Sequence, residues 1–289
     1  MGYIIRATAH KGDVRVFVAI TTDLVEKARK AHDLSPTASA ALGRVLTAGS
    51  IMGTMLKGDN TSMTISMNGK GVLGNLVVTA KANGNVKGYV SNPQADLPLK
   101  ENGKLDVGGA IGTDGFINVI KDLGLKEPYV GQSPIVTGEI GDDLAYYYTV
   151  SEQVPTAVAV GVLVDKDVSI LSAGGLIIQM MPTDNEFIAD IITYRLEEIP
   201  PISTLVAEGK SGEDILNLLF DDMDLVIHEK IEVDYVCDCS TQRIEKALIS
   251  LGKEELERLK EEEEQMEVQC HFCNKKYVFS KKDIENLMQ

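Results

Sequence analysis

The chain has 289 residues, 44% of them hydrophobic, and a formal net charge of -15 at pH 7, which is enough chain for one large core and a smaller unit. It contains no run of about 18 uncharged apolar residues and no N-terminal apolar stretch of the secretory kind, so we expect a cytoplasmic protein with no membrane partner. Its acidity argues against general nucleic-acid binding, which needs clustered Lys and Arg.

The first 180 residues mix strand and helix patterns. The β-pair expected at 3–9 and 14–20 surrounds a turn signal, and residues 23–32 predict a short helix. Ser35 followed by Pro36 predicts the start of a second helix, whose Ala, Gly and Met residues suit close packing in a core. Further strands are expected at 62–68, 72–80, 85–91, 154–164 and 168–182. Residues 1–180 therefore predict an α+β core domain of mixed β-sheet and helices.

The sequence of residues 181–232 predicts an acidic helical linker. Thr183 and Glu186 fit a capping box at the start of one helix, and Ser211 precedes a second. Between positions 184 and 230 there are twelve Asp and Glu but only three Lys and Arg. A segment with apolar faces and this much like charge is expected to be helical only while it is docked on something else.

The sequence of residues 233–289 predicts a small C-terminal domain. A helix is expected after Ser240, and an acidic helix at 254–264. Short strands at 266–269 and 277–279 can pair, and Ser280 can cap a final helix.

All four cysteines of the chain fall in this last domain: Cys237, Cys239, Cys270 and Cys273. They read C-D-C and, thirty residues later, C-H-F-C. Two close pairs separated by a long loop predict one tetrahedral Zn²⁺ site with four thiolate ligands. Such a site leaves no position for a reacting water, so we expect no enzyme activity from it. His271 is interpreted as a spectator.

Spacing alone favours a purely structural zinc site, but three features point to a redox switch. The C-x-C pair is tighter than the usual C-x-x-C. A small acidic domain depends heavily on a metal that supplies ~10–16 kcal/mol, since whole domains hold only about 5–15 kcal/mol. Each cysteine also has a close neighbour in sequence with which oxidation can form a local disulfide.

The chain closely resembles the heat-shock protein 33 family of redox-regulated holdase chaperones over essentially its whole length. The most specific part is the C-x-C and C-x-x-C arrangement of the four cysteines. Supporting segments are GNVKGYVSNP at 84–93, VPTAVAVGVLV at 154–164, AGGLIIQMMP at 173–182 and EEIPPISTLVAEG at 197–209.

The resemblance implies a protein that is zinc-bound and inactive when reduced. Oxidants would form Cys237–Cys239 and Cys270–Cys273 disulfides, release zinc and unfold the linker. The active form would be a homodimer that holds unfolding client proteins without ATP, in agreement with the absence of a G-x-x-x-x-G-K-[ST] phosphate loop. Client contact and ordinary helix packing are equally compatible with the apolar linker residues Phe187, Ile191, Ile192, Leu218, Leu219 and Phe220.

Two other functions remain open from the sequence. A zinc-ribbon regulatory protein that binds nucleic acid would use the basic residues Lys275, Lys276, Lys281 and Lys282, although acidic residues at 261–264 oppose them. A dithiol oxidoreductase would use C-H-F-C, but that motif is expected to follow a strand and begin a helix within a βαβ fold.

Overall fold

The computed structural model describes residues 1–183, 187–262 and 265–288. The chain folds into two compact units, Met1–Val236 and Cys237–Gln289, each of which is built around its own apolar clusters. The α+β class predicted from the sequence is confirmed. Among the described residues, no helix is both long and apolar enough to cross a membrane.

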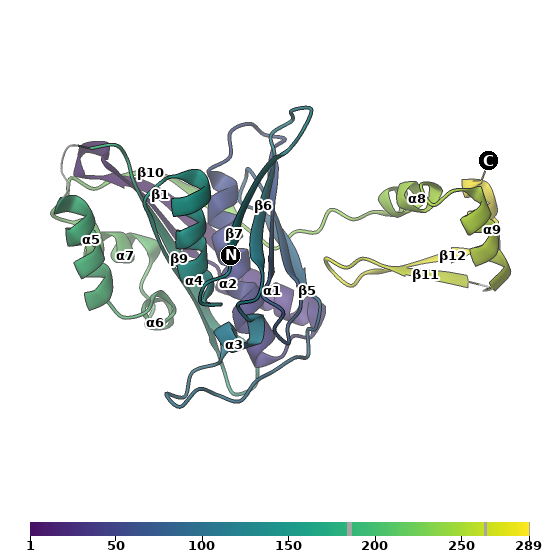
Figure 1. The fold of residues 1–289 in the computed structure, drawn as a ribbon, viewed down its shortest axis with the longest axis horizontal. Helices are drawn as coiled ribbons and strands as arrows, with labels where there is room; N and C mark the ends of the chain where they lie inside the picture. The colour runs from purple at the N-terminus through teal and green to yellow at the C-terminus, as the bar shows by residue number, and fades with distance from the viewer. Residues whose placement is uncertain (184–186, 263–264, 289) are drawn as a thin grey trace. The chain divides into compact units, whose positions relative to one another are not determined.

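The first unit contains two five-stranded antiparallel sheets (Figure 1). The first sheet has the strand order β10-β1-β2-β9-β8 and the second has the order β5-β4-β3-β6-β7. The strands of the first sheet are β1 (Gly2–Ala9), β2 (Val14–Ile20), β8 (Thr156–Val164), β9 (Ile170–Met180) and β10 (Val226–Val233). Those of the second are β3 (Ser62–Asn68), β4 (Leu76–Lys81), β5 (Val86–Val90), β6 (Phe116–Asp122) and β7 (Tyr129–Pro134).

Helix α2 (Pro36–Thr54) lies between the two sheets (Figure 1). The Ser35 side chain caps it by accepting a hydrogen bond from the Ala38 backbone, and Pro36 occupies its first turn, as the sequence predicted. Small residues allow the close approach that the helix needs. A Cβ on Gly53, for example, would lie 2.5 Å from the Lys81 carbonyl oxygen. The prediction of a tightly packed core helix is therefore confirmed.

Four shorter helical segments complete this part of the first unit. They are α1 (Thr22–His32), α3 (Val107–Ile111), α4 (Ile140–Tyr147) and a π-helical turn at Tyr148–Glu152 that directly follows α4. A 3₁₀ turn at His10–Gly12 joins β1 to β2, where the sequence predicted a turn.

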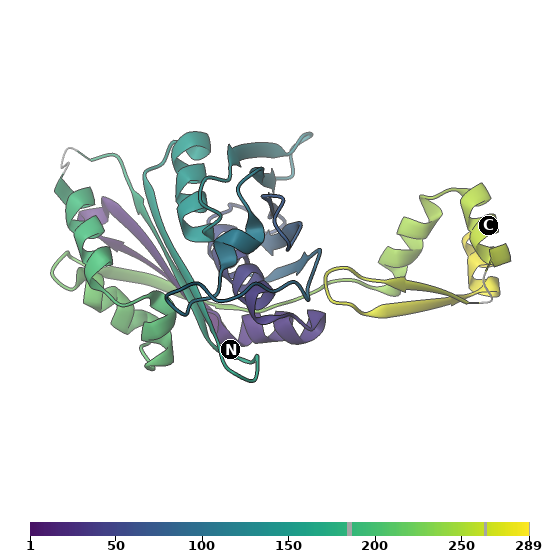
Figure 2. The same ribbon diagram turned by 60° about the horizontal axis from the view of Figure 1, so that its bottom comes forward.

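Three helices cover the other face of the first sheet (Figure 2). They are α5 (Phe187–Glu198), α6 (Ile202–Ala207) and α7 (Gly212–Phe220). Ser211 and Asp214 form a capping box at the start of α7, which confirms the helix predicted after Ser211. The capping box predicted for Thr183 and Glu186 lies partly outside the described residues. Together the helices and the sheet enclose an apolar cluster, which we call the linker cluster: Ile5, Ala7, Val16, Val18, Leu176, Ile178, Ile188, Ile192, Ile202, Leu205, Ile215, Leu216, Leu219 and Phe220 are among its buried members.

Residues 226–232, which the sequence analysis placed in a helical linker, form strand β10 instead. The strand pairs antiparallel with β1, with Gly2 opposite Val233. Pairing with β1 satisfies the backbone N–H and C=O groups of this strand. Across the pair, Arg6 forms an ion pair with Glu229 at 2.6 Å. The helical expectation failed because it relied on local charge and ignored this free edge of the sheet.

The segment after β10 is anchored to the first unit up to its last residues. Val86 donates a backbone hydrogen bond to Asp234, and Val236 donates one back to Val86, at 3.0 and 2.8 Å. The Tyr235 hydroxyl donates to the Gly88 carbonyl at 2.8 Å and lies 3.0 Å from His32 Nε2. The chain is therefore held to the core immediately before Cys237.

In the described residues of the second unit, a β-hairpin is accompanied by three helices. Strands β11 (Gln265–Gln269) and β12 (Lys276–Ser280) pair antiparallel, as predicted. The expected caps are present: Ser240 caps α8, and Ser280 with Asp283 forms a capping box on the last helix. The acidic helix expected at 254–264 is observed up to Glu262, and residues 263–264 lie outside the described residues. The helices are α8 (Thr241–Ile249), α9 (Lys253–Glu262) and α10 (Lys281–Leu287).

Candidate metal centre

Two short segments of the second unit carry the cysteines. Cys237 and Cys239 lie just before α8, where Arg243 forms an ion pair with Asp238 at 2.6 Å. Cys270 and Cys273 lie in the turn between β11 and β12. In that turn the Cys270 carbonyl accepts backbone hydrogen bonds from Cys273 and Asn274 at 3.3 and 2.8 Å. The second pair is thus held by a short hydrogen-bonded turn, whereas the first pair lies in an irregular segment that leads into α8.

The four Sγ atoms converge within 4.8 Å of one another. Cys237 Sγ lies 3.7 Å from Cys270 Sγ, and Cys239 Sγ lies 3.4 Å from Cys273 Sγ. A tetrahedron with metal–sulfur bonds of about 2.3 Å has edges of roughly 3.8 Å. The donor set and its spacing therefore fit one tetrahedral metal ion. His271 is exposed and is not part of this group.

The four cysteines are partly shielded from solvent. Cys270 is 9% exposed, and the other three cysteines are of intermediate burial. Among the described residues, only seven buried side chains form the apolar core of the unit. They are Leu248, Leu256, Met266, Cys270, Tyr277, Phe279 and Ile284. One of the seven is itself a candidate ligand, so the metal site and the core of this unit share residues.

The surroundings favour a thiolate at Cys239 over one at Cys237 or Cys273. Burial opposes ionisation of Cys239, but hydrogen bonds from Tyr277 and the other thiols outweigh it and lower the pKa to about 7. Burial raises the pKa of Cys237 and of Cys273. Four thiolates cannot coexist here without a cation to balance them, and a bound divalent metal supplies that charge.

Tyr277 is a site residue that the sequence analysis missed. Its hydroxyl donates a hydrogen bond to Cys239 Sγ at 3.1 Å. This hydrogen bond raises the pKa of Tyr277 to about 12, so the hydroxyl keeps its proton and remains a donor. The sequence around Tyr277, YVF, predicts a strand but does not indicate which residue the tyrosine hydroxyl contacts.

The six apolar linker residues separate into two groups. Phe187, Ile191 and Leu218 are 74%, 43% and 52% exposed, respectively. Ile192, Leu219 and Phe220 are 4%, 1% and 1% exposed and belong to the linker cluster. The structure therefore leaves three of them accessible and places three in helix packing.

Comparisons with known proteins agree over the whole chain. A family model described as "Hsp33 protein" matches residues 2–280. A "33 kDa chaperonin" of Clostridium beijerinckii is 55% identical over 285 residues, covering 99% of this chain and 97% of the relative. One of Clostridium tetani is 56% identical over 286 residues, with the same coverage. The crystal structure of the 33 kDa chaperonin (heat shock protein 33 homolog) of Thermotoga maritima matches with a TM-score of 0.92 and 38% identity, covering 99% of this chain and 97% of that one.

Proposed function

The chain belongs to the Hsp33 family of chaperones, and on that premise we propose that it is a redox-regulated, ATP-independent holdase. Cys237, Cys239, Cys270 and Cys273 would hold one Zn²⁺ in the reduced, inactive state. The single observation that carries this proposal is the convergence of the four Sγ atoms within 4.8 Å.

Bound zinc would supply the cross-link that stabilises the second unit. Structural zinc contributes ~10–16 kcal/mol to small domains, and the seven-residue core here offers little else. The chain's own residues position the ligands: the Cys270 turn orients one pair, and Tyr277 stabilises the thiolate of Cys239. Removal of the metal would therefore unfold this unit.

We propose that oxidation forms Cys237–Cys239 and Cys270–Cys273. Each disulfide removes two electrons from a pair of thiolates and passes them to an oxidant such as hypochlorite or peroxide. In the folded unit, close sulfur contacts join one pair to the other, at 3.7 and 3.4 Å. These contacts between the two pairs exist only while the unit is folded. The two cysteines of each pair are neighbours in sequence and stay close after the unit opens, which favours a disulfide within each pair.

The linker segment 181–232, between a core at 1–180 and a zinc domain at 233–289, would connect the metal to client binding. Its helices α5, α6 and α7 cover the linker cluster. Their release would expose apolar surface on both sheet and helices for unfolding proteins. In the active state the chain would be a homodimer in the cytoplasm. Clients would be proteins and not nucleic acid, because the net charge is -15 and Lys276 is paired with Glu267 at 2.9 Å.

The proposal is tested by titrating the reduced, zinc-loaded chain with hypochlorite. Released zinc is measured with a chromophoric chelator, and suppression of client aggregation is measured on the same samples. We expect both to rise together and to reverse when dithiothreitol and Zn²⁺ are added. Holdase activity that is already complete in the reduced protein and unchanged by oxidation would overturn the redox switch but leave the chaperone family assignment intact.

The client surface is tested with paired substitutions in one helix. Leu218→Ser changes an exposed side chain of α7, and Leu219→Ser changes its buried neighbour. If the exposed residues bind clients, Leu218→Ser weakens aggregation suppression by oxidised protein without lowering the unfolding free energy. Leu219→Ser should instead destabilise the reduced fold. Full client binding by Phe187→Ser, Ile191→Ser and Leu218→Ser proteins would remove these three residues from the client site.

A further inference from the structure

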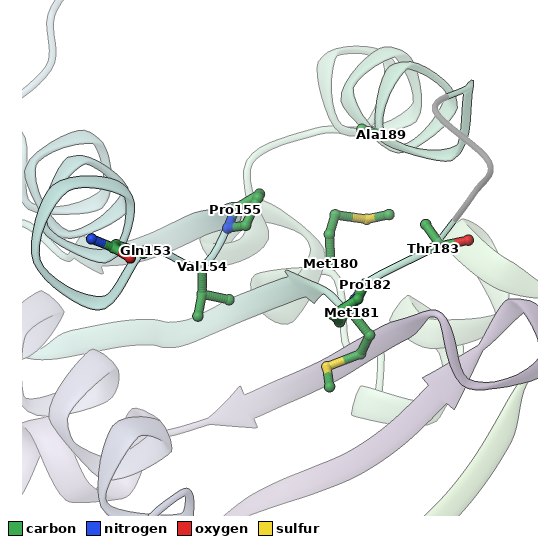
Figure 3. A pocket seen from close by; sticks show the side chains of 8 residues that line it. All are labelled: Gln153, Val154, Pro155, Met180, Met181, Pro182, Thr183 and Ala189. Atoms are coloured by element: carbon green, nitrogen blue, oxygen red, sulfur yellow. The ribbon is translucent and has the colours of Figure 1, made fainter.

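A cavity of about 410 Å³ lies where β8 begins, β9 ends and α5 packs against the first sheet (Figure 3). Its wall is mainly apolar and includes Val154, Pro155, Met180 and, from α5, Ala189. The metal centre plays no part in this site, since every lining residue belongs to the first unit.

Met180 is the side chain that connects this cavity to the linker cluster. It is the last residue of β9 and shares a face with Leu176 and Ile178, because alternate residues of a strand point the same way. It packs against the linker cluster while remaining half-buried. In Figure 3 its thioether points into the cavity on the α5 side. An oxidant small enough to enter the cavity therefore reaches the sulfur.

Met181 provides a natural comparison at the next position. It is 36% exposed and, in Figure 3, points away from Met180 and from α5. Three methionines of the inter-sheet core are closed to solvent: Met52, Met63 and Met67 are 2%, 2% and 0% exposed. Exposure thus distinguishes Met180 and Met181 from these core residues, and orientation distinguishes Met180 from Met181.

We propose that the Met180 thioether is a second oxidant-sensing site, at which conversion to the sulfoxide loosens α5 from the first sheet. Hypochlorous acid is the oxidant class. Its oxygen forms a bond to sulfur, the O–Cl bond breaks, and chloride and a proton leave. Sulfur loses two electrons, which chlorine gains. No cysteine or metal takes part.

The sulfoxide acts by changing a side chain that packs against the linker cluster, to which α5 also belongs. A thioether is apolar and adapts its shape to a core, whereas a sulfoxide is polar and a strong hydrogen-bond acceptor. Its oxygen must turn to water in the cavity, which withdraws the side chain from the linker cluster. Helix α5 is held to that cluster mainly by Ile188 and Ile192, which are 1% and 4% exposed. Weaker packing in that cluster raises the fraction of time that α5 is open.

The experiment uses the full zinc-loaded chain and separates methionine from cysteine chemistry. The protein is treated with dilute hypochlorite and then with dithiothreitol and Zn²⁺, which restore thiols and metal but leave methionine sulfoxide. Only protein with all four thiols restored is analysed. Peptide mass spectrometry locates the sulfoxide, and amide hydrogen exchange measures the opening of α5. Met180→Leu and Met181→Leu, which nearly conserve volume, are treated in parallel.

In the wild type and in Met181→Leu we expect α5 to exchange roughly tenfold faster after oxidation and thiol repair. Met180→Leu should show no change, and methionine sulfoxide reductases acting on both epimers should restore the wild-type rate. Absence of sulfoxide at position 180, equal acceleration in Met180→Leu, or no reversal by the reductases would each overturn the proposal. No client or metal release is measured, so the outcome is independent of the proposed redox switch.

Discussion

The hydroxyl of Tyr277 donates a hydrogen bond to Cys239 Sγ at 3.1 Å, which joins a residue of β12 to the opposite cysteine pair. Hydrogen bonds to a thiolate favour its charged form, and this one contributes to the lowered pKa of Cys239. The contact would therefore influence how well protons compete with a metal bound at Cys239.

Tyr277→Phe should weaken metal binding by about tenfold. Without the hydroxyl, the pKa of Cys239 rises from its value of about 7, so protons compete more strongly with the metal as the pH falls to about 7. The loss of affinity should therefore grow as the pH falls to about 7 and level off below it. Competition with a chromophoric chelator at several pH values measures it, with Tyr146→Phe in the first unit as the control. Equal affinities of wild type and Tyr277→Phe at every pH would contradict this role.

Tyr235→Phe should loosen the segment that precedes Cys237. The change removes the hydrogen bond to the Gly88 carbonyl and the contact with His32, whose side chain is only 6% exposed. We expect the unfolding free energy of the first unit to fall by about 1–2 kcal/mol. The amide of Val236, which donates to Val86, should also exchange faster. Denaturant unfolding and hydrogen exchange test this, and unchanged exchange at Val236 would show that the hydroxyl does not anchor the segment.

Glu26 connects α1 to β9 and should make the unfolding free energy depend on pH. It accepts hydrogen bonds from Arg29 at 2.8 Å and from the Ile170 backbone at 3.1 Å. The Arg29 hydrogen bond lowers the pKa of Glu26 from 4.5 to about 2, against the effect of burial.

Because the folded pKa lies below the unfolded one, the stabilisation by Glu26 is complete above 4.5 and disappears as the pH falls toward 2. Glu26→Gln should therefore lower the unfolding free energy by about 1–2 kcal/mol at neutral pH, and the difference from wild type should vanish in acid. Urea unfolding over this range measures it, with the exposed Glu101→Gln as control. A difference that stays constant with pH would rule out the carboxylate as its source.

Gly161→Ala should lift α6 from the first sheet. A Cβ at this position of β8 would lie 2.6 Å from Ser203 Oγ and 2.9 Å from Ser203 Cβ, closer than real contacts allow. We expect a loss of about 1–3 kcal/mol and faster amide exchange in α6. Adding Ser203→Gly removes both atoms and should recover part of the loss. Normal exchange of α6 in Gly161→Ala would mean that the backbone relaxes elsewhere.

The predictable parts of this fold are those with short-range signals. Ser35 with Pro36, Ser211 with Asp214, and Ser280 with Asp283 define helix starts within four residues, and all three helices are present. The clustering of the four cysteines was equally accessible to prediction, because they are a rare residue type in two short motifs. Each motif is visible in the sequence without knowledge of the fold that brings the two together.

The unpredicted parts depend on partners far away in the chain. Strand β10 exists because β1 offers a free edge, and α6 packs where Gly161 allows it. Tyr277 reaches Cys239 only through the hairpin that β12 forms with β11.

The pairing of Gly2 with Val233 has a consequence for biosynthesis. Strand β1 leaves the ribosome before β10, the neighbour that completes its outer edge, and more than 200 residues are made between them. At 5–20 residues per second, roughly 10–45 seconds separate the two. During that interval β1 is an unprotected edge of the kind that recruits other chains. A nascent copy of this chaperone is therefore itself a candidate for protection until its synthesis is nearly finished.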